Sequence, residues 1–321
     1  MGFNDLMSRA EASMEKGGFE AAIKDLDEAI RLEPKKAPAY ILRGEAHREL
    51  EQHDKARKDL DAAIAIDPTL ALAFLSRSEI SLEQEDFGAA IEDLDEAIRL
   101  DPTIPFLFVS RGDAYFGQEE LAKALADFNE AIRLDSGSSY SYLRRGELYI
   151  EREEYENAIK DLGEAIRLDP ADPAAYVSRG NAFMEIGKYE DAIKDISKAI
   201  ELEPDSALAY FSRGEVYAEI GELDDAIEDF GAGIRLDPEA AIAYVSRGSV
   251  YSELGELEKA VADFDMAIEL EPDSAIAYAG RGQARMQTGE KEKAVADLER
   301  ALELEPDLDW IEQELQGLRE S

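Results

Sequence analysis

Apolar residues recur along the chain at helical spacing, in stretches of about a dozen positions separated by short polar turns. Residues 206–238 show the pattern most clearly. A first stretch contains Tyr210 and Tyr217, a glycine interrupts the spacing, and a second stretch contains Ile227 and Ile234 before a closing proline. The spacing predicts two short amphipathic helices joined by a tight turn.

The same two-helix pattern returns every 34 residues, with no insertion or deletion. One alanine of the second helix is present in every copy, at Ala22, Ala56, Ala90, Ala124, Ala158, Ala192, Ala226, Ala260 and Ala294. The closing proline stands at Pro34, Pro68, Pro102, Pro170, Pro204, Pro238, Pro272 and Pro306, and Ser136 takes the one missing place. A small residue of the first helix, most often glycine, faces the alanine and predicts two closely packed helices.

This period and these small residues resemble the tetratricopeptide repeat (TPR). The resemblance implies an all-α fold, a right-handed superhelical solenoid of antiparallel helix pairs. The predicted repeats are 3–36, 37–70, 71–104, 105–138, 139–172, 173–206, 207–240, 241–274 and 275–308. Residues 309–321 are expected to form a C-terminal capping helix, with Trp310, Ile311, Leu315 and Leu318 on its apolar side. One elongated domain is expected, because each repeat buries its apolar stripe on its neighbours.

Two departures from the pattern fall in the first half. Glu51, Glu85, Glu119 and Glu153 replace the glycine between the two helices, which predicts either backbone strain or a turn that closes differently. At the fourth junction the usual Asp-Pro becomes Asp-Ser-Gly around Ser136, which predicts added flexibility. We therefore expect a slightly looser first half.

A charged pair recurs in every repeat. An arginine directly precedes the small residue of the first helix. An aspartate of the second helix stands sixteen positions after that arginine. Arg213 and Asp229, and Arg247 and Asp263, are examples. A bidentate ion pair between packed helices explains this recurrence better than an array of arginines displayed to a ligand.

The TPR resemblance implies that the first helices line a concave groove that grips a peptide. The residues at these groove-lining positions are often acidic, and others are apolar. The candidate binding residues are Phe106, Val109, Phe116, Tyr140, Leu143, Arg144, Glu147, Ile150, Glu151, Asn181, Glu215 and Glu219. An acidic groove with an apolar floor favours a basic or amphipathic peptide. The alternative is that the glutamates serve only solubility.

Composition narrows the choice of partners. The chain has 35 basic and 74 acidic residues, a net charge of -39, and no cysteine. Nucleic acids and anionic membranes are unfavourable partners for such a charge. No catalytic or metal-binding motif is present, and the two histidines, His47 and His53, replace aromatic packing residues. A non-enzymatic protein without cofactor or metal, located in the cytoplasm, is expected.

Three functions remain open at this stage. The first is a protein interaction scaffold that binds a peptide or protein segment. The second is a structural solenoid that associates with itself. The third is an engineered or idealised repeat scaffold without a natural ligand.

Overall fold

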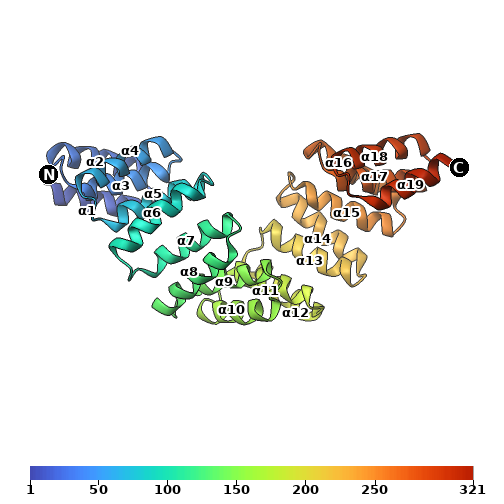
Figure 1. The fold of residues 1–321 in the computed structure, drawn as a ribbon, viewed down its shortest axis with the longest axis horizontal. Coiled ribbons are helices and arrows are strands. Elements are labelled where there is room, and N and C mark those ends of the chain that lie inside the picture. Colours follow the sequence, from blue (N-terminus) through green and yellow to red (C-terminus); the bar gives the residue numbers. More distant parts are fainter. Residues whose placement is uncertain (321) are drawn as a thin grey trace. The chain divides into compact units, whose positions relative to one another are not determined.

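The computed structural model describes residues 1–320, apart from the side chains of residue 309 and residues 316–320. The described part consists of helices and turns (Figure 1). The first eighteen helices form antiparallel pairs, and their bounds are α1 Phe3–Met14, α2 Phe19–Leu32, α3 Ala37–Arg48, α4 His53–Ile66, α5 Ala71–Glu83, α6 Phe87–Leu100, α7 Pro105–Gly117, α8 Leu121–Leu134, α9 Ser139–Glu151, α10 Tyr155–Leu168, α11 Pro173–Glu185, α12 Tyr189–Leu202, α13 Ala207–Glu219, α14 Leu223–Leu236, α15 Ala241–Glu253, α16 Leu257–Leu270, α17 Ala275–Gln287 and α18 Lys291–Leu304. A final helix, α19, spans Asp309–Glu320.

Close packing within each pair follows from the small residues. The recurring alanine is fully buried in every repeat, as Ala22 and Ala226 illustrate. A β-carbon added at Gly112 on α7 would lie 2.5 Å from the ring of Phe128 on α8. Because real β-carbons do not approach so closely, the glycine permits the large ring to fill the space between the two helices.

The turns inside the pairs adopt one conformation whatever residue they contain. Glu51, Glu85, Glu119 and Glu153 have φ between 56° and 59°, and the corresponding glycines have φ between 70° and 82°. At both Gly17 and Glu51 the same two hydrogen bonds close the helix end, for example Gly18 N–H to Ser13 O at 2.8 Å and Gln52 N–H to His47 O at 2.9 Å. The glutamates therefore keep the turn and place their backbone in the left-handed region.

The junction that lacks proline is also ordered by local hydrogen bonds. The Asp135 carboxylate accepts a hydrogen bond from Gly137 N–H at 2.8 Å, as Asp67 does from Thr69 N–H at 3.0 Å. The Ser138 hydroxyl then caps α9 by accepting from Ser141 N–H at 3.2 Å. The same Asx turn thus forms at this junction with serine in place of proline.

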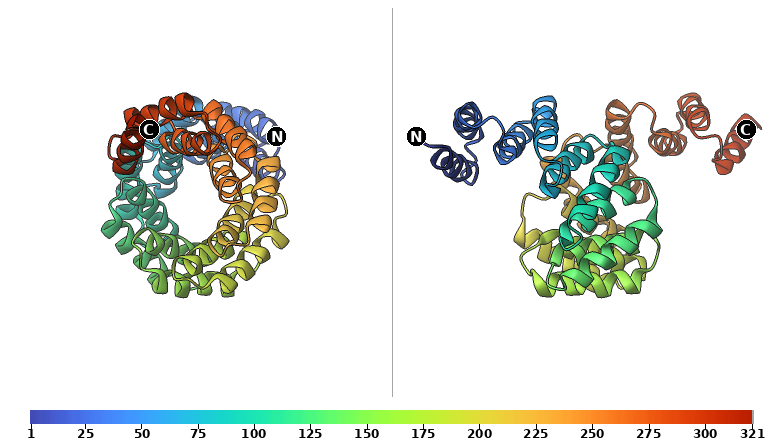
Figure 2. Two further views of the ribbon diagram at one scale, coloured as in Figure 1. Left: turned by 90° about the vertical axis from the view of Figure 1, so that its right-hand side faces the viewer. Right: turned by 60° about the vertical axis from the view of Figure 1, so that its left-hand side comes forward.

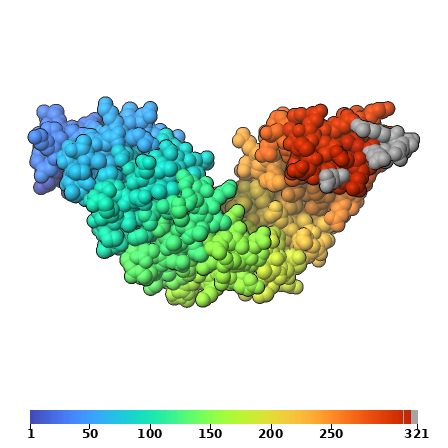
Figure 3. Space-filling model, viewed as in Figure 1, coloured from blue at the N-terminus to red at the C-terminus, as the bar shows by residue number. Residues whose placement is uncertain are grey.

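The chain divides into two compact units, Met1–Leu168 and Asp169–Ser321. Within each unit, successive helix pairs stack side by side (Figure 2) and follow chain order along the surface (Figure 3). Successive odd-numbered helices of one unit also approach each other, while no comparable approach of even-numbered helices is found in the described part. The odd-numbered helices therefore lie on the inner side of each unit.

The final helix covers the last repeat. Ile311 and Leu315 of α19 are buried against Ala279, Leu298 and Ala301. The predicted contribution of Leu318 lies outside the described side chains, and Ser321 lies outside the described residues. In the part of the chain that the structure describes, no helix is long and apolar enough to cross a membrane.

Candidate functional site

On one face of several odd-numbered helices, an apolar side chain lies near the start of the helix and acidic side chains lie near its end. On α13, Leu208, Glu215 and Glu219 are separated by seven and four residues, so at about 100° per residue they project in nearly the same direction. Leu208 is 63% exposed. On α5, α9 and α13 this spacing places an apolar side chain near the start and two carboxylates towards the end, whereas α17 has no carboxylate.

Stacking of the repeats arranges these positions into rows. We call the exposed apolar or aromatic side chains at the second residue of six odd-numbered helices the apolar row: Leu72, Phe106 and Tyr140 in the first unit, and Leu208, Ile242 and Ile276 in the second. We call the carboxylates at or near the ends of odd-numbered helices the acidic row: Glu45, Glu49, Glu79, Glu83, Asp113, Glu147 and Glu151 in the first unit, and Glu185, Glu215, Glu219 and Glu253 in the second.

Arg48 binds several members of the acidic row in the first unit. Its Nη1 donates to Glu83 Oε1 at 2.6 Å, and its Nη2 donates to Glu49 Oε1 at 2.9 Å and lies 3.4 Å from Glu79 Oε2. The nearby Glu45 carboxylate accepts from the Ser76 hydroxyl at 2.9 Å. Burial raises the pKa of both Glu45 and Glu79, because desolvation outweighs the attraction of Arg48.

Arg144 occupies a similar place between α7 and α9. Its Nε donates to Asp113 Oδ1 at 2.8 Å, its Nη1 binds Glu147, and its guanidinium lies over the Phe116 ring at 5.7 Å. The Tyr140 hydroxyl donates to Asp113 Oδ2 at 3.3 Å. Desolvation raises the pKa of Tyr140 to about 12 and raises that of Asp113 despite the arginine. Most carboxylates of the acidic row in the first unit therefore lie beside Arg48 or Arg144.

An open depression of about 310 Å³ in the second unit is lined by Met184, Glu185, Tyr189, Glu215 and Glu219. Within the described residues, neither Glu215 nor Glu219 has a hydrogen bond or ion pair. Desolvation in the depression, followed by repulsion from Glu185, raises the pKa of Glu215. This depression combines the side chains of Met184 and Tyr189 with the carboxylates of Glu215 and Glu219, which have no ion pair in the described part of the chain.

The candidate binding residues differ in their accessibility. Phe106 and Tyr140 are 46% and 44% exposed, and Glu151, Glu215 and Glu219 are exposed as well. Val109 and Leu143 are buried, so they belong to the core under the apolar row and are not available to a ligand. The remaining candidates are half-buried: Phe116, Arg144, Glu147, Ile150 and Asn181.

The side-chain amide of Asn181 stands apart from the other candidates. Its Oδ1 is buried and accepts no hydrogen bond from the described residues. The two histidines, His47 and His53, belong to the first unit. His47 Nδ1 is 3.1 Å from Gln52 Oε1, and no group of three metal-ligating side chains is found in the described part.

The recurring arginine and aspartate form bidentate pairs between the two helices of each repeat. Arg247, for example, donates from Nε to Asp263 Oδ2 at 2.7 Å and from Nη2 to Asp263 Oδ1 at 2.8 Å. The rings of Tyr244 and Tyr251 flank its guanidinium at 5.8 and 5.9 Å. The arginines are therefore held between helices and do not form an array for a ligand.

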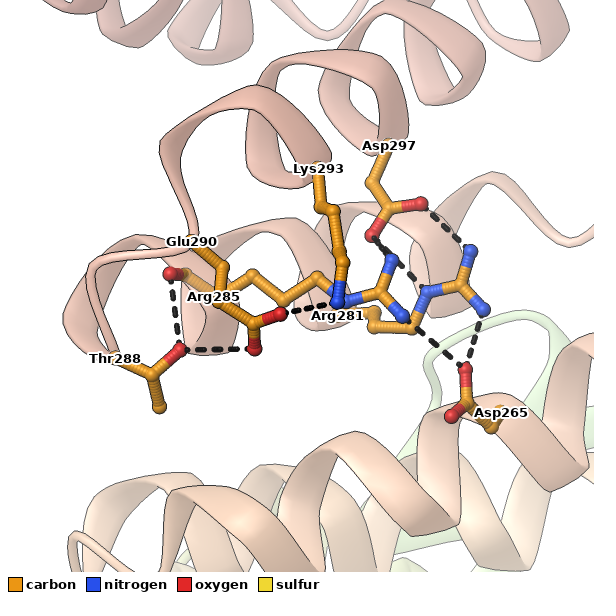
Figure 4. A network of polar contacts seen from close by, with 7 residues as sticks. All are labelled: Asp265, Arg281, Arg285, Thr288, Glu290, Lys293 and Asp297. Carbon is orange, nitrogen blue, oxygen red and sulfur yellow. Dashed lines mark hydrogen bonds and ion pairs between the residues drawn. The ribbon is translucent and has the colours of Figure 1, made fainter.

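A second acceptor for these arginines was not anticipated from the sequence. Asp27, Asp61 and Asp95 accept a hydrogen bond at 2.6 Å from Nη1 of the arginine in the following repeat. Asp265 accepts the same bond from Arg281 at 2.5 Å (Figure 4). The signal was present as Asp-x-Asp in the second helices, in which the first aspartate pairs within the repeat and the second pairs with the next.

Protein-family models match most of the chain. A model described as TPR repeat matches residues 146–187, 180–221, 214–255 and 248–289. Two models described as tetratricopeptide repeat match residues 7–71 and 78–139, and residues 275–308. No curated protein sequence matches the chain.

Solved structures share the fold. A tetratricopeptide repeat protein from Parabacteroides merdae ATCC 43184 has a TM-score of 0.61 and 23% identity, over 78% of this chain and 98% of that one. A chain of the APC/C hetero-tetramer Cut9-Hcn1 has a TM-score of 0.67 and 14% identity, over 98% of this chain and 75% of that one. With family models matching more than half of its length, the chain belongs to the tetratricopeptide repeat family.

Proposed function

We propose that this protein is a non-enzymatic interaction scaffold that binds a basic, amphipathic peptide on the inner face of its odd-numbered helices. The TPR fold suggests a protein interaction scaffold. The observation that carries the ligand class is the alignment of the apolar row with the acidic row on the same helix face. A peptide with apolar side chains along one edge and Lys or Arg along the other complements both rows.

The second unit supports this assignment most strongly. Leu208, Ile242 and Ile276 expose 63%, 59% and 58% of their surface in consecutive repeats. The depression beside Glu215 and Glu219 has room for the end of a long side chain and offers Met184 and Tyr189 to its methylene groups. A Lys or Arg of the peptide fits this depression because its stem is apolar and its tip is cationic.

The solubility alternative accounts for fewer of the observations. Acidic residues that serve only solubility have no reason to share a helix face with a continuous set of exposed Leu and Ile side chains. Charged residues on the even-numbered helices, such as the pair of Arg31 and Glu28, already provide a hydrated surface. The paired rows therefore favour recognition of a ligand.

The test is a peptide screen with the full chain, followed by fluorescence anisotropy at low and high salt. We expect basic amphipathic peptides to bind and their affinity to fall as salt screens the acidic row. Replacing Leu208 and Ile242 with serine should weaken binding at least tenfold. Leu236→Ser is the matched control, because Leu236 is 42% exposed on the even-numbered helix α14.

Light scattering on the same samples distinguishes self-association from peptide binding. Binding that is equal in the Leu208/Ile242 variant and in the Leu236 control would contradict the proposal. So would a preference for acidic over basic peptides. If the chain instead forms concentration-dependent oligomers through the apolar row, the row is an assembly surface and the peptide proposal fails.

A further inference from the structure

One inter-repeat hydrogen bond is interrupted at Gly231 on α14. In four other repeats an aspartate at this position accepts from Nη1 of the next repeat's arginine at 2.5 to 2.6 Å. Gly231 has no side chain, and Nη1 of Arg247 has no acceptor in the described part of the chain. The donor therefore remains while its usual carboxylate is absent.

A second guanidinium group lies at the same point. A β-carbon built on Gly231 would be 3.6 Å from Nη1 of Arg247 and 3.6 Å from Nη1 of Arg235. The arginines that correspond to Arg235 in four other repeats bind a glutamate three residues earlier: Arg31, Arg99, Arg133 and Arg167. Ala232 occupies that place before Arg235, so no such partner is available.

Arg247 is held in position for a ligand. Its Nε and Nη2 are bound to Asp263, and the rings of Tyr244 and Tyr251 flank its guanidinium plane. A donor that is already fixed in orientation loses little conformational entropy when it binds an acceptor. Arg235 is exposed and approaches from one turn further along the same helix, so it can close on that acceptor.

In the last repeats two guanidinium groups approach the aspartate that corresponds to Gly231, although both come from α17 (Figure 4). The Asp265 carboxylate accepts from Arg281 Nη1 at 2.5 Å and lies 3.7 Å from Arg285 Nη2. Both arginines also bind Asp297, which gives two guanidinium groups and two carboxylates. A carboxylate at the Gly231 position would complete the same charge balance with Arg235, Arg247 and Asp263.

We propose that Gly231, Arg235 and Arg247 form an oxyanion site that binds a carboxylate or phosphate group supplied from outside the chain. Both groups present oxygen atoms in the geometry that a guanidinium group recognises. This site is independent of the peptide proposal, because it lies between α14 and α15, contains no member of the apolar or acidic row, and prefers the opposite charge.

The test uses NMR of the arginine Nε–H groups in the full chain, titrated with sodium acetate or with inorganic phosphate. Sodium chloride keeps the ionic strength constant. We expect the signals of Arg247 and Arg235 to shift in a saturable way. Arg281 is the internal control, because Asp265 already occupies its Nη1. A response to acetate alone identifies a carboxylate site, and a response to phosphate alone identifies a phosphate site.

Two variants make the test reciprocal. Gly231→Asp should abolish the response of Arg247 by supplying an internal carboxylate. Asp265→Gly should create a response at Arg281 that the unmodified chain lacks. The proposal is overturned if neither anion shifts Arg247, if Arg281 shifts equally in the unmodified chain, or if Gly231→Asp leaves the response unchanged. The NMR spectra also report whether each variant is folded.

Discussion

Arg213 and Asp229 are joined by two parallel hydrogen bonds, from Nε to Oδ2 at 2.7 Å and from Nη2 to Oδ1 at 2.8 Å. The arginine side chain is 20% exposed and that of the aspartate is 6% exposed. The pair connects α13 to α14, and Arg213 Nη1 also donates to Ser197 on α12 at 3.0 Å. One guanidinium group thus links three consecutive helices.

Removing one partner of this pair should be more harmful than removing both. We expect Asp229→Ala to cost about 3 kcal/mol of unfolding free energy, because it strands a largely buried guanidinium group. Replacing Arg213 and Asp229 together with leucine should cost less. Chemical denaturation measures both changes, and Asp224→Ala, on the exposed side of α14, is the control. Equal losses for the single and double variants would contradict this interpretation.

Phe211 and Gly233 should behave as a compensating pair. A β-carbon at Gly233 would overlap the Phe211 ring, whereas the corresponding residues one repeat later are Val245 and Ala267. We expect Gly233→Ala to destabilise the fold by about 1–3 kcal/mol through overpacking. Adding Phe211→Val should restore most of that loss. A double-mutant cycle by thermal denaturation checks the coupling, and strictly additive effects would refute it.

The left-handed glutamates provide a third test. Glu85→Gly should stabilise the chain by about 1 kcal/mol, because glycine adopts positive φ without steric strain. Glu92→Gly, in the exposed interior of α6, is the matched control and should destabilise by about 1 kcal/mol. Urea denaturation of the two variants gives the comparison. A loss of stability in both variants would show that the turn tolerates glutamate without strain.

The pKa of Glu45 links its charge to folding. Because desolvation raises that pKa in the folded state, ionisation of Glu45 disfavours folding at neutral pH. Glu45→Gln should therefore stabilise the protein at pH 7 while retaining an acceptor for Ser76. The advantage should fall as the pH decreases through the raised pKa, and it should vanish below about 4.5, the unperturbed value. Melting temperatures across this pH range measure the effect, with Glu92→Gln as the control.

Acidification should weaken the binding of a basic peptide. The Glu215 carboxylate attracts a cation only when it is ionised, and its raised pKa brings protonation to a higher pH than usual for glutamate. Affinity should therefore begin to fall above pH 4.5 as the solution is acidified. Anisotropy titrations with the unmodified chain and Glu215→Gln check this. A similar pH dependence in both would exclude Glu215 as the cause.

The sequence by itself determined the repeat and its helices. The 34-residue period places apolar residues, glycines and prolines where the helix pairs begin, turn and end, and these are local properties of the backbone and its side chains. The recurrence of Arg and Asp in each repeat also pointed to their contact, because both occupied the same two positions nine times. The period by itself does not show how the repeats group into two compact units, because that grouping depends on contacts and not on spacing.

Only the tertiary structure decided which of the marked residues are accessible and paired. Val109 and Phe106 are separated by one helical turn, yet one is buried and the other exposed, since neighbouring helices cover one side of α7. Arg48 and Arg144 neutralise carboxylates from adjacent repeats, contacts that span 31 or more residues of sequence. The missing acceptor at Gly231 likewise has meaning only beside Arg247, which folding brings across from the next repeat.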